Sequence, residues 1–137
     1  MKHREAVSHI MSKDVKTVHR KQNLAEVQAL MEEFNIRHIP VVDGEKVVGM
    51  LSRTDIMHAR YGAIQGGEEL QTTLLEQMPV EKAMTADPKT ISAGQSVRDA
   101  GVMLHEGHFS ALPVIEDGKL AGIVTTKDLI GYLLDQY

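Results

Sequence analysis

The sequence predicts an α+β fold built from two β-α-β-β-α repeats that pack together with pseudo-two-fold symmetry. The main observation is a duplication, because residues 7–56 align with residues 80–129 at a constant offset of 73, and twelve of the fifty positions are identical. A second observation is size, since a repeat of about fifty residues rarely buries enough apolar surface to fold alone. Identical polar and turn residues, such as Asp14/Asp87 and Gly49/Gly122, indicate that the duplication retains geometry.

The first repeat reads as strand, helix, strand, strand, helix. Thr17-Val18 forms a short extended piece, after which Asn23 caps a helix with apolar residues at helical spacing, namely Leu24, Val27, Leu30, Met31 and Phe34. A hairpin follows, with strands at 39–42 and 47–51 around Asp43-Gly44, because Asp-Gly supplies the positive φ angles of a tight turn. A second helix is expected to start near Arg53 and to end by Gly62.

The second repeat follows the same order. Its expected elements are a strand at Thr90-Ile91, a helix opening at Ser96 with Asp99 three residues on, strands at 112–115 and 120–124 around Asp117-Gly118, and a helix from Thr126. The intervening stretch is rich in glycine and polar residues and is interpreted as a linker, although residues 70–78 could form a short helix. The expected division is a first domain at 1–61, a linker at 62–79 and a second domain at 80–137.

Composition excludes several classes of protein. Hydrophobic residues make up 42% of the chain and charged residues 25%, as in soluble globular proteins, and no apolar run reaches the length of a membrane span. The N-terminus lacks the apolar core of a signal peptide and there are no cysteines, so a cytoplasmic location is expected. A net charge of -4 and an aromatic content of 4% disfavour nucleic-acid binding.

The residues most suited to binding lie where the last strand of each repeat meets its second helix. The two segments read Gly49-x-x-Ser52-x-x-Asp55 and Gly122-x-x-Thr125-x-x-Asp128. A hydroxyl followed three residues later by an acid is typical of a capping box, which needs no ligand. The helix start also suits a phosphate, the glycine permits close approach of backbone or ligand, and a carboxylate can accept ribose hydroxyls. Arg53 or Lys127 could neutralise phosphate charge.

These motifs resemble a tandem pair of cystathionine beta-synthase (CBS) domains, often called a Bateman module. In both repeats the resemblance rests on Met-Ser/Thr-x-Asp near the start, a Pro-Val pair in the middle strand and Gly-x-x-Ser/Thr-x-x-Asp before the last helix. The resemblance implies a stand-alone regulatory module that binds an adenosine nucleotide in the cleft between the repeats and signals by conformational change. It also implies homodimers through the helices after Ser52 and Thr125, and an effector protein that the sequence does not identify.

The same resemblance assigns residues to the nucleotide site. Asp55 and Asp128 would hold ribose hydroxyls, and Ser52 and Thr125 would contact phosphate or ribose. Thr17 and Thr90 would line the pocket. The segments that would flank the adenine are Ile36 to Ile39, with Arg37 and His38, and Phe109 to Leu112, with Ser110 and Ala111. The charge of Arg53 and Lys127, proposed above from residue type, adds to these contacts. AMP, ADP or ATP is the expected ligand class, and NAD and S-adenosylmethionine stay open as alternatives.

The two repeats differ where charge matters. The first offers Arg37, His38 and Arg53, whereas the second has Ser110, Ala111 and Thr126 at these positions, with Lys127 as the nearest cation. We therefore expect the Asp55 site to prefer the more highly phosphorylated ligand. The alternative is that Arg37 and Arg53 are solvated surface charges.

An enzymatic function is not expected. Similar modules are embedded in inosine monophosphate dehydrogenases, but the duplicated unit consumes almost every residue and no cysteine nucleophile exists. His105 and His108 could bind a metal only if they converged, and Gly107 is expected to end the helix between them, so no metal site is predicted. The second function that the sequence supports is a ligand-free scaffold whose exposed helices pair two modules.

Overall fold

The computed structural model describes residues 4–61 and 67–137, which form two compact units. The first-repeat unit comprises Lys16–Asp87, and the second-repeat unit comprises Pro88–Tyr137 together with the chain up to Val15. The expected boundaries follow the duplicated sequence, whereas the compact units divide the chain after Val15 and after Asp87. The segment that precedes each repeat therefore packs on the other repeat.

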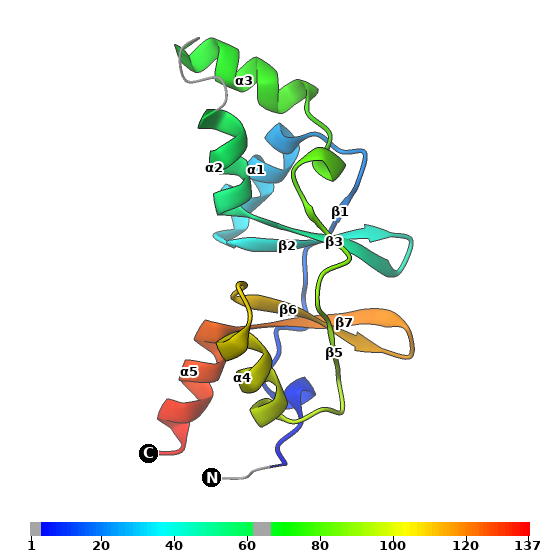
Figure 1. Ribbon diagram of the computed structural model, residues 1–137, viewed down its shortest axis with the longest axis vertical. Helices are drawn as coiled ribbons and strands as arrows, with labels where there is room; N and C mark the ends of the chain where they lie inside the picture. The colour runs from blue at the N-terminus through cyan, green and yellow to red at the C-terminus, as the bar shows by residue number, and fades with distance from the viewer. Residues whose placement is uncertain (1–3, 62–66) are drawn as a thin grey trace. The chain divides into compact units, whose positions relative to one another are not determined.

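The first-repeat unit places helices on one face of a four-stranded sheet (Figure 1). Its strand order is β1-β2-β3-β4, with β1 parallel to β2 and the other pairs antiparallel. In chain order the elements are β1 (Val18–His19), α1 (Leu24–Phe34), β2 (His38–Asp43), β3 (Lys46–Ser52), α2 (Arg53–Tyr61), α3 (Gly67–Gln77), the 3-10 turn η3 (Val80–Lys82) and β4 (Thr85–Ala86).

The second-repeat unit repeats this arrangement with three strands in the order β5-β6-β7. Its first element is the 3-10 turn η1 (Val7–His9), which the N-terminal segment contributes. The others are β5 (Ile91–Ser92), α4 (Val97–Glu106), β6 (Ala111–Glu116), β7 (Lys119–Thr125) and α5 (Thr126–Asp135). The predicted α+β fold class with two β-α-β-β-α repeats is confirmed.

The predicted helix starts and one of the two predicted turns are confirmed. The Asn23 side chain accepts a hydrogen bond from the amide of Glu26, and Ser96 and Asp99 form a reciprocal capping box. Asp117 and Gly118 have φ angles of 53° and 79°, as a primed hairpin turn requires. The first hairpin differs by one residue: Asp43 ends β2, and Gly44, with φ of 65°, begins the turn.

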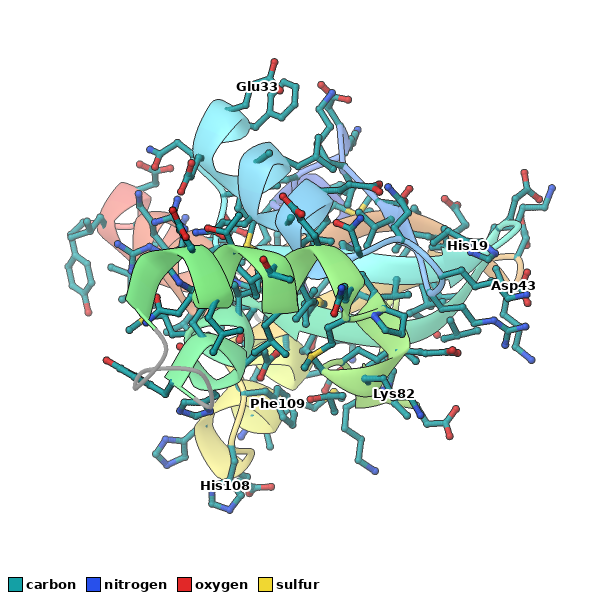
Figure 2. All side chains as sticks on the ribbon, turned by 90° about the horizontal axis from the view of Figure 1, so that it is seen from above. His19, Glu33, Asp43, Lys82, His108 and Phe109 are labelled. Atoms are coloured by element: carbon teal, nitrogen blue, oxygen red, sulfur yellow. The ribbon has the colours of Figure 1, made fainter. Side chains whose placement is uncertain are left out.

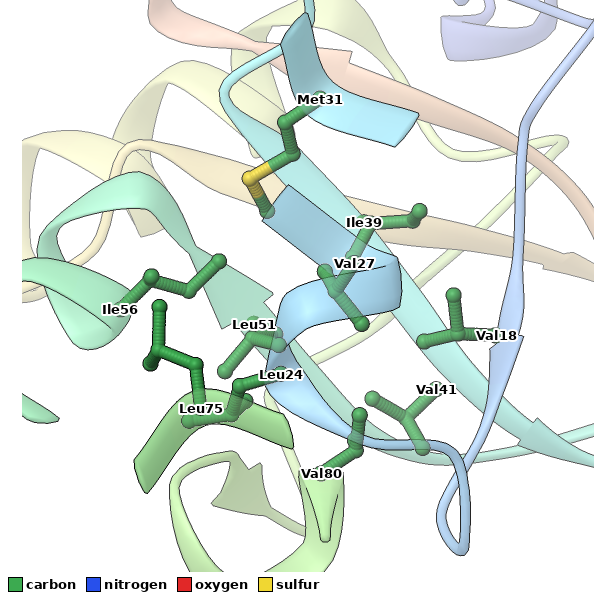
Figure 3. Close-up of a cluster of buried hydrophobic side chains, with 10 residues drawn as sticks. All are labelled: Val18, Leu24, Val27, Met31, Ile39, Val41, Leu51, Ile56, Leu75 and Val80. Carbon is green, nitrogen blue, oxygen red and sulfur yellow. The ribbon is translucent and has the colours of Figure 1, made fainter. Parts of the chain in front are cut away.

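The first-repeat core is closed by a helix that the sequence places in a linker. Leu75 on α3 is only 3% exposed and joins the buried cluster formed by α1, α2 and the sheet (Figure 3). Residues 67–77 of the expected linker at 62–79 are thus a packed helix, in agreement with the alternative drawn for 70–78. Residues 62–66 of that linker, and the expected helix end at Gly62, lie outside the described residues.

Two short segments are exchanged between the repeats, and each completes the other repeat's sheet and core. Val7 and Val80 are fully buried, Val7 in the second-repeat core and Val80 in the first-repeat core. The amide and carbonyl of Ser12 pair with those of Ile123 at 2.9 and 3.0 Å, while β4 pairs with Gly49 and Met50 of β3. Each copy of the duplicated Met-Ser/Thr-x-Asp motif thus packs against the strands of the other repeat.

Among the residues that the structure describes, no helix combines the length and the apolar character needed to cross a membrane.

Candidate functional site

The first candidate site forms where β3 ends at Ser52 and α2 begins at Arg53. The backbone amide of Ser52 donates to Oδ2 of Asp55 at 2.8 Å, and the amide of Asp55 donates to Oγ of Ser52 at 3.1 Å. The expected capping box is therefore present, and both side chains are half-buried. The register of β2 and β3 places His38 opposite Ser52, which brings a third expected residue to the same strand end.

The second repeat forms the same two capping hydrogen bonds at its own junction. The amide of Thr125 donates to Oδ2 of Asp128 at 2.9 Å, and the amide of Asp128 donates to Oγ1 of Thr125 at 3.2 Å. Ala111 lies opposite Thr125 in the β6–β7 register. Only Oδ2 of Asp55 and of Asp128 takes part in the caps; in the described part of the chain, Oδ1 of each accepts no hydrogen bond.

A backbone hydrogen bond ties the segment before each middle strand to the helix start. The amide of Arg53 donates to the carbonyl of Arg37, and the amide of Thr126 donates to the carbonyl of Ser110, both at 3.0 Å. Within each unit, the residues expected to flank adenine thus lie beside the hydroxyl and the carboxylate. These flanking residues are Ile36, Arg37 and His38 in one unit, and Phe109, Ser110 and Ala111 in the other.

Each motif glycine makes room for a methionine of the exchanged segments. A Cβ on Gly49 would clash with Sδ of Met84, and a Cβ on Gly122 would lie 2.6 Å from Sδ of Met11 and 2.7 Å from the carbonyl oxygen of Ser12. The close approach expected at these glycines is therefore made by methionine side chains and, at Gly122, also by backbone. Packing of the exchanged segments accounts for both glycines without a ligand.

The environment of His38, at the first junction, changes the pKa of its imidazole. Burial lowers the pKa of His38 below 6.5; the Asp55 carboxylate opposes this shift and the Arg37 guanidinium adds to it. Both Asp55 and Arg37 thus lie within electrostatic reach of the His38 imidazole. The second repeat has the uncharged Ala111 at this position.

The remaining expected residues occupy the surface near the junctions. Thr17 and Thr90 are exposed and immediately precede β1 and β5, respectively. Arg37 and Lys127 are exposed, whereas Arg53 is half-buried because its guanidinium folds toward α1. Nη2 of Arg53 donates to the carbonyl of Met31 and to Oδ1 of Asn35, each at 3.4 Å.

The structure also contains one side-chain pair that the sequence analysis did not predict. Nζ of Lys16 lies 4.4 Å from the centroid of the Phe34 ring. Phe34, the last residue of α1, is expected on the buried face of its helix but is 44% exposed. The signal in the sequence is that Lys16 is one of the identical positions, with Lys89 as its counterpart, and directly precedes Thr17.

Two surface hollows lie away from these junctions. One, of about 380 Å³, lies between α1, α2 and α3, and the other, of about 550 Å³, lies between the N-terminal segment and the β6–β7 hairpin. Near the turn of the β2–β3 hairpin, Nε2 of His19 lies 3.9 Å from Oδ1 of Asp43 (Figure 2). Within the described ranges, no group of three or more histidines or acids is placed to hold a metal, and Gly107 caps α4 between His105 and His108 as expected.

Comparisons with known proteins agree with this architecture. The family model described as CBS domain matches residues 7–62 and 80–135. A 17.7 kDa protein of Acidianus ambivalens is 36% identical over 132 residues, covering 94% of this chain and 73% of that protein. An inosine-5'-monophosphate dehydrogenase of Korarchaeum cryptofilum is 31% identical over 118 residues, covering 85% of this chain, so the chain spans only 22% of the dehydrogenase.

Solved structures share the fold. CBSX2, an Arabidopsis thaliana protein solved in complex with AMP, aligns with a TM-score of 0.81 at 24% identity, over 96% of this chain and 97% of CBSX2. MJ1225 from Methanocaldococcus jannaschii, proposed as an archaeal homologue of g-AMPK, aligns with a TM-score of 0.83 at 22% identity, over 97% of this chain and 49% of MJ1225.

Proposed function

Since the chain belongs to the CBS domain family, we propose that it is a cytoplasmic regulatory module that binds an adenosine nucleotide and signals by a change of conformation. AMP, ADP and ATP form the ligand class, and CBSX2 supports it because that protein was solved with AMP. The partner that receives the signal is an effector protein. The module has no catalytic residues of its own in this proposal, because the match to the dehydrogenase covers only 22% of that enzyme.

The observation that carries the proposal is the pair of strand-to-helix junctions with equivalent capping hydrogen bonds. Each supplies a hydroxyl, a helix amino end and a carboxylate with one oxygen outside the cap. A capping role alone needs only the oxygen already used, whereas a ribose with two adjacent hydroxyls needs a second acceptor. Asp55 and Asp128 are proposed to accept ribose hydroxyls, and Ser52 and Thr125 to contact phosphate or ribose.

The other proposed contacts follow from their place around these junctions. Ile36 and Phe109 flank the adenine, because each is linked through the next residue's carbonyl to a helix start. Thr17 and Thr90 line the pocket from the segments that precede β1 and β5. Charge is supplied by Arg37 and Arg53 in one unit and by Lys127 in the other.

A thermal-shift series with purified protein tests this function. A true ligand at a hundred times its dissociation constant stabilises the fold by about 2.7 kcal/mol. We expect AMP, ADP or ATP to raise the melting temperature of the wild type, and Asp55→Asn combined with Asp128→Asn to abolish that rise. Asp99→Asn is the matched control, because Asp99 occupies the same place in a capping box away from the junctions. If no adenosine nucleotide raises the melting temperature of the wild type, the proposed nucleotide-binding function is wrong.

Exposed apolar side chains support a second, compatible role as a dimerisation scaffold. On α5, Ile130 is 53% and Leu134 70% exposed, and on α2 Met57 is 50% exposed. Surfaces of this kind commonly pair identical subunits. We propose a homodimer through α2 and α5, and Leu134→Glu should shift the protein to monomer in analytical ultracentrifugation, whereas Val102→Glu on α4 should not.

A further inference from the structure

Three cationic residues from separate segments of the chain lie at or directly after the C-terminal end of α1. Lys16 precedes β1 and holds its ammonium over the ring of Phe34. Arg53, at the start of α2, donates to the carbonyl of Met31 and to the Asn35 side chain. Arg37 follows α1 and accepts the amide of Arg53 on its own carbonyl. We call the set Lys16, Phe34, Arg37 and Arg53 the α1 corner.

Helix stability explains these contacts only in part. Cations favour the negative end of a helix, which gives Arg53 a structural role. Its two hydrogen bonds are 3.4 Å long, however, well beyond the usual 2.7 to 3.2 Å for such bonds, so the guanidinium is weakly held. A large ring left 44% exposed under an ammonium adds little stability at the surface. Both cations can therefore leave these positions for an anion at small cost.

The α1 corner adjoins the carboxylate proposed to hold ribose. Arg53 lies two residues before Asp55 on the first turn of α2, and its amide binds the carbonyl of Arg37. A nucleotide with its ribose on Asp55 would direct its phosphates toward neighbouring positive charge, and Arg53 brings one cation of the corner to the helix turn that carries Asp55. The purely structural function of Asp55 would not require any of them.

The same corner in the second-repeat unit has lost both features. Gly107 replaces Phe34, and the ring of Phe109 packs against that glycine instead. Thr126 replaces Arg53, and its hydroxyl donates to the carbonyl of Ser110 at 3.5 Å. Lys89 remains as the counterpart of Lys16, without a ring at residue 107 to hold its ammonium. The duplication therefore provides an internal control for the corner.

We propose that the α1 corner recognises the β- and γ-phosphates of a nucleoside di- or triphosphate, so that the first-repeat site selects polyphosphorylated ligands over monophosphates. Lys16 and Arg53 are the phosphate contacts, and Phe34 is a positioning residue that holds Lys16 at the site while it is empty. The inference rests on the proposed nucleotide function for the ribose and base, but the phosphate contacts themselves depend only on the corner.

Calorimetric titration with AMP, ATP and inorganic tripolyphosphate tests this assignment. We expect wild-type protein to bind ATP at least about tenfold more tightly than AMP, because each charge-assisted contact contributes on that scale. Lys16→Ala and Arg53→Ala should each reduce ATP and tripolyphosphate affinity about tenfold or more and flatten the salt dependence, while leaving AMP nearly unchanged. Lys16→Arg should retain most of the wild-type affinity for ATP and tripolyphosphate. Phe34→Leu should reduce that affinity by less than Lys16→Ala does. Lys89→Ala is the matched control and should change none of these affinities.

The outcomes separate this inference from the proposed function. If Lys16→Ala and Lys89→Ala change the ligand affinities equally, or if neither changes them, the phosphate role of the α1 corner is wrong, while the proposed nucleotide-binding function is unaffected. Tripolyphosphate binding that requires Lys16, without any nucleotide preference over tripolyphosphate, would support the corner and overturn the nucleotide function. Absence of binding by all three ligands would overturn both. Melting temperatures of each variant confirm that it remains folded.

Discussion

The two repeats agree in their backbone hydrogen bonds and differ in the side chains around the first helix's end. The capping distances at Ser52/Asp55 and Thr125/Asp128 differ by only 0.1 Å, and each first helix of a repeat is capped three residues before its first acid. In contrast, the positions of Phe34 and Arg53 carry glycine and threonine in the second repeat. The duplication has therefore retained the scaffold of the site and varied its charge.

The units also differ in how their helical layer is covered. In the first-repeat unit, α3 packs on α1 and α2 and buries Leu75. In the described part of the second-repeat unit, no third helix packs on α4 and α5, and several apolar residues of α5 stay exposed. The helical layer of the first-repeat unit is thus covered by its own third helix, whereas α5 of the second-repeat unit leaves apolar side chains exposed.

The largest expected effect tests the role of α3. Leu75→Ala removes a side chain that is 3% exposed, so we expect the free energy of unfolding to fall by about 3 kcal/mol. Leu70→Ala on the same helix is the control, because Leu70 is half exposed and should change stability by less than about 0.5 kcal/mol. Chemical denaturation measures both, and equal effects would show that α3 does not close the first core.

The next prediction concerns the exchanged segments. Gly122→Ala should cost about 2 kcal/mol, because its Cβ would meet the carbonyl of Ser12, which cannot move without breaking the Ser12–Ile123 pairing. Gly49→Ala should cost about 1 kcal/mol, since the nearest atoms belong to the flexible Met84 side chain. Gly94→Ala meets no atom within 4 Å and serves as the control. A larger loss for Gly49→Ala in thermal unfolding would contradict the packing described here.

A smaller and equal effect is expected at the two capping boxes. Ser52→Ala and Thr125→Ala should each lower stability by about 1 kcal/mol, because each leaves a helix amide without its acceptor. Thr54→Ala changes an exposed residue of the same first turn and should be nearly neutral. A twofold difference between the repeats would break the equivalence of the junctions.

The smallest prediction uses pH. Because burial lowers the pKa of His38 in the folded state, the unfolded chain takes up a proton at a higher pH than the folded chain does. The wild type should therefore lose stability as pH falls through about 6.5 and below, and His38→Ala should lose less over the same interval. Urea midpoints between pH 7.5 and 5.5 measure the difference, and identical slopes would exclude His38 as the cause.

Much of the fold follows from local sequence signals. Helix caps at Asn23 and Ser96 and the Asp117-Gly118 turn depend on neighbouring residues alone, so they are readable without tertiary information. The Lys16–Phe34 pair cannot be read in this way, because an interval of eighteen residues matches no local period that would bring a residue before a strand to the end of a helix. The turn at Gly44 has the same register as the second hairpin, because Asp43 pairs with Lys46 as Glu116 pairs with Lys119.

The sequence by itself determined that one unit is written twice and that each copy ends in a hydroxyl-and-acid helix start. Only the tertiary structure decided which copy each leading segment completes. Met11 and Met84 share the same motif, as do Gly49 and Gly122, so residue types alone permit either pairing. The structure selects Met11 with Gly122 and Met84 with Gly49. The physical reason is that burial of Val7 and Val80 depends on three-dimensional packing, which an alignment of two segments that share the same motif does not contain.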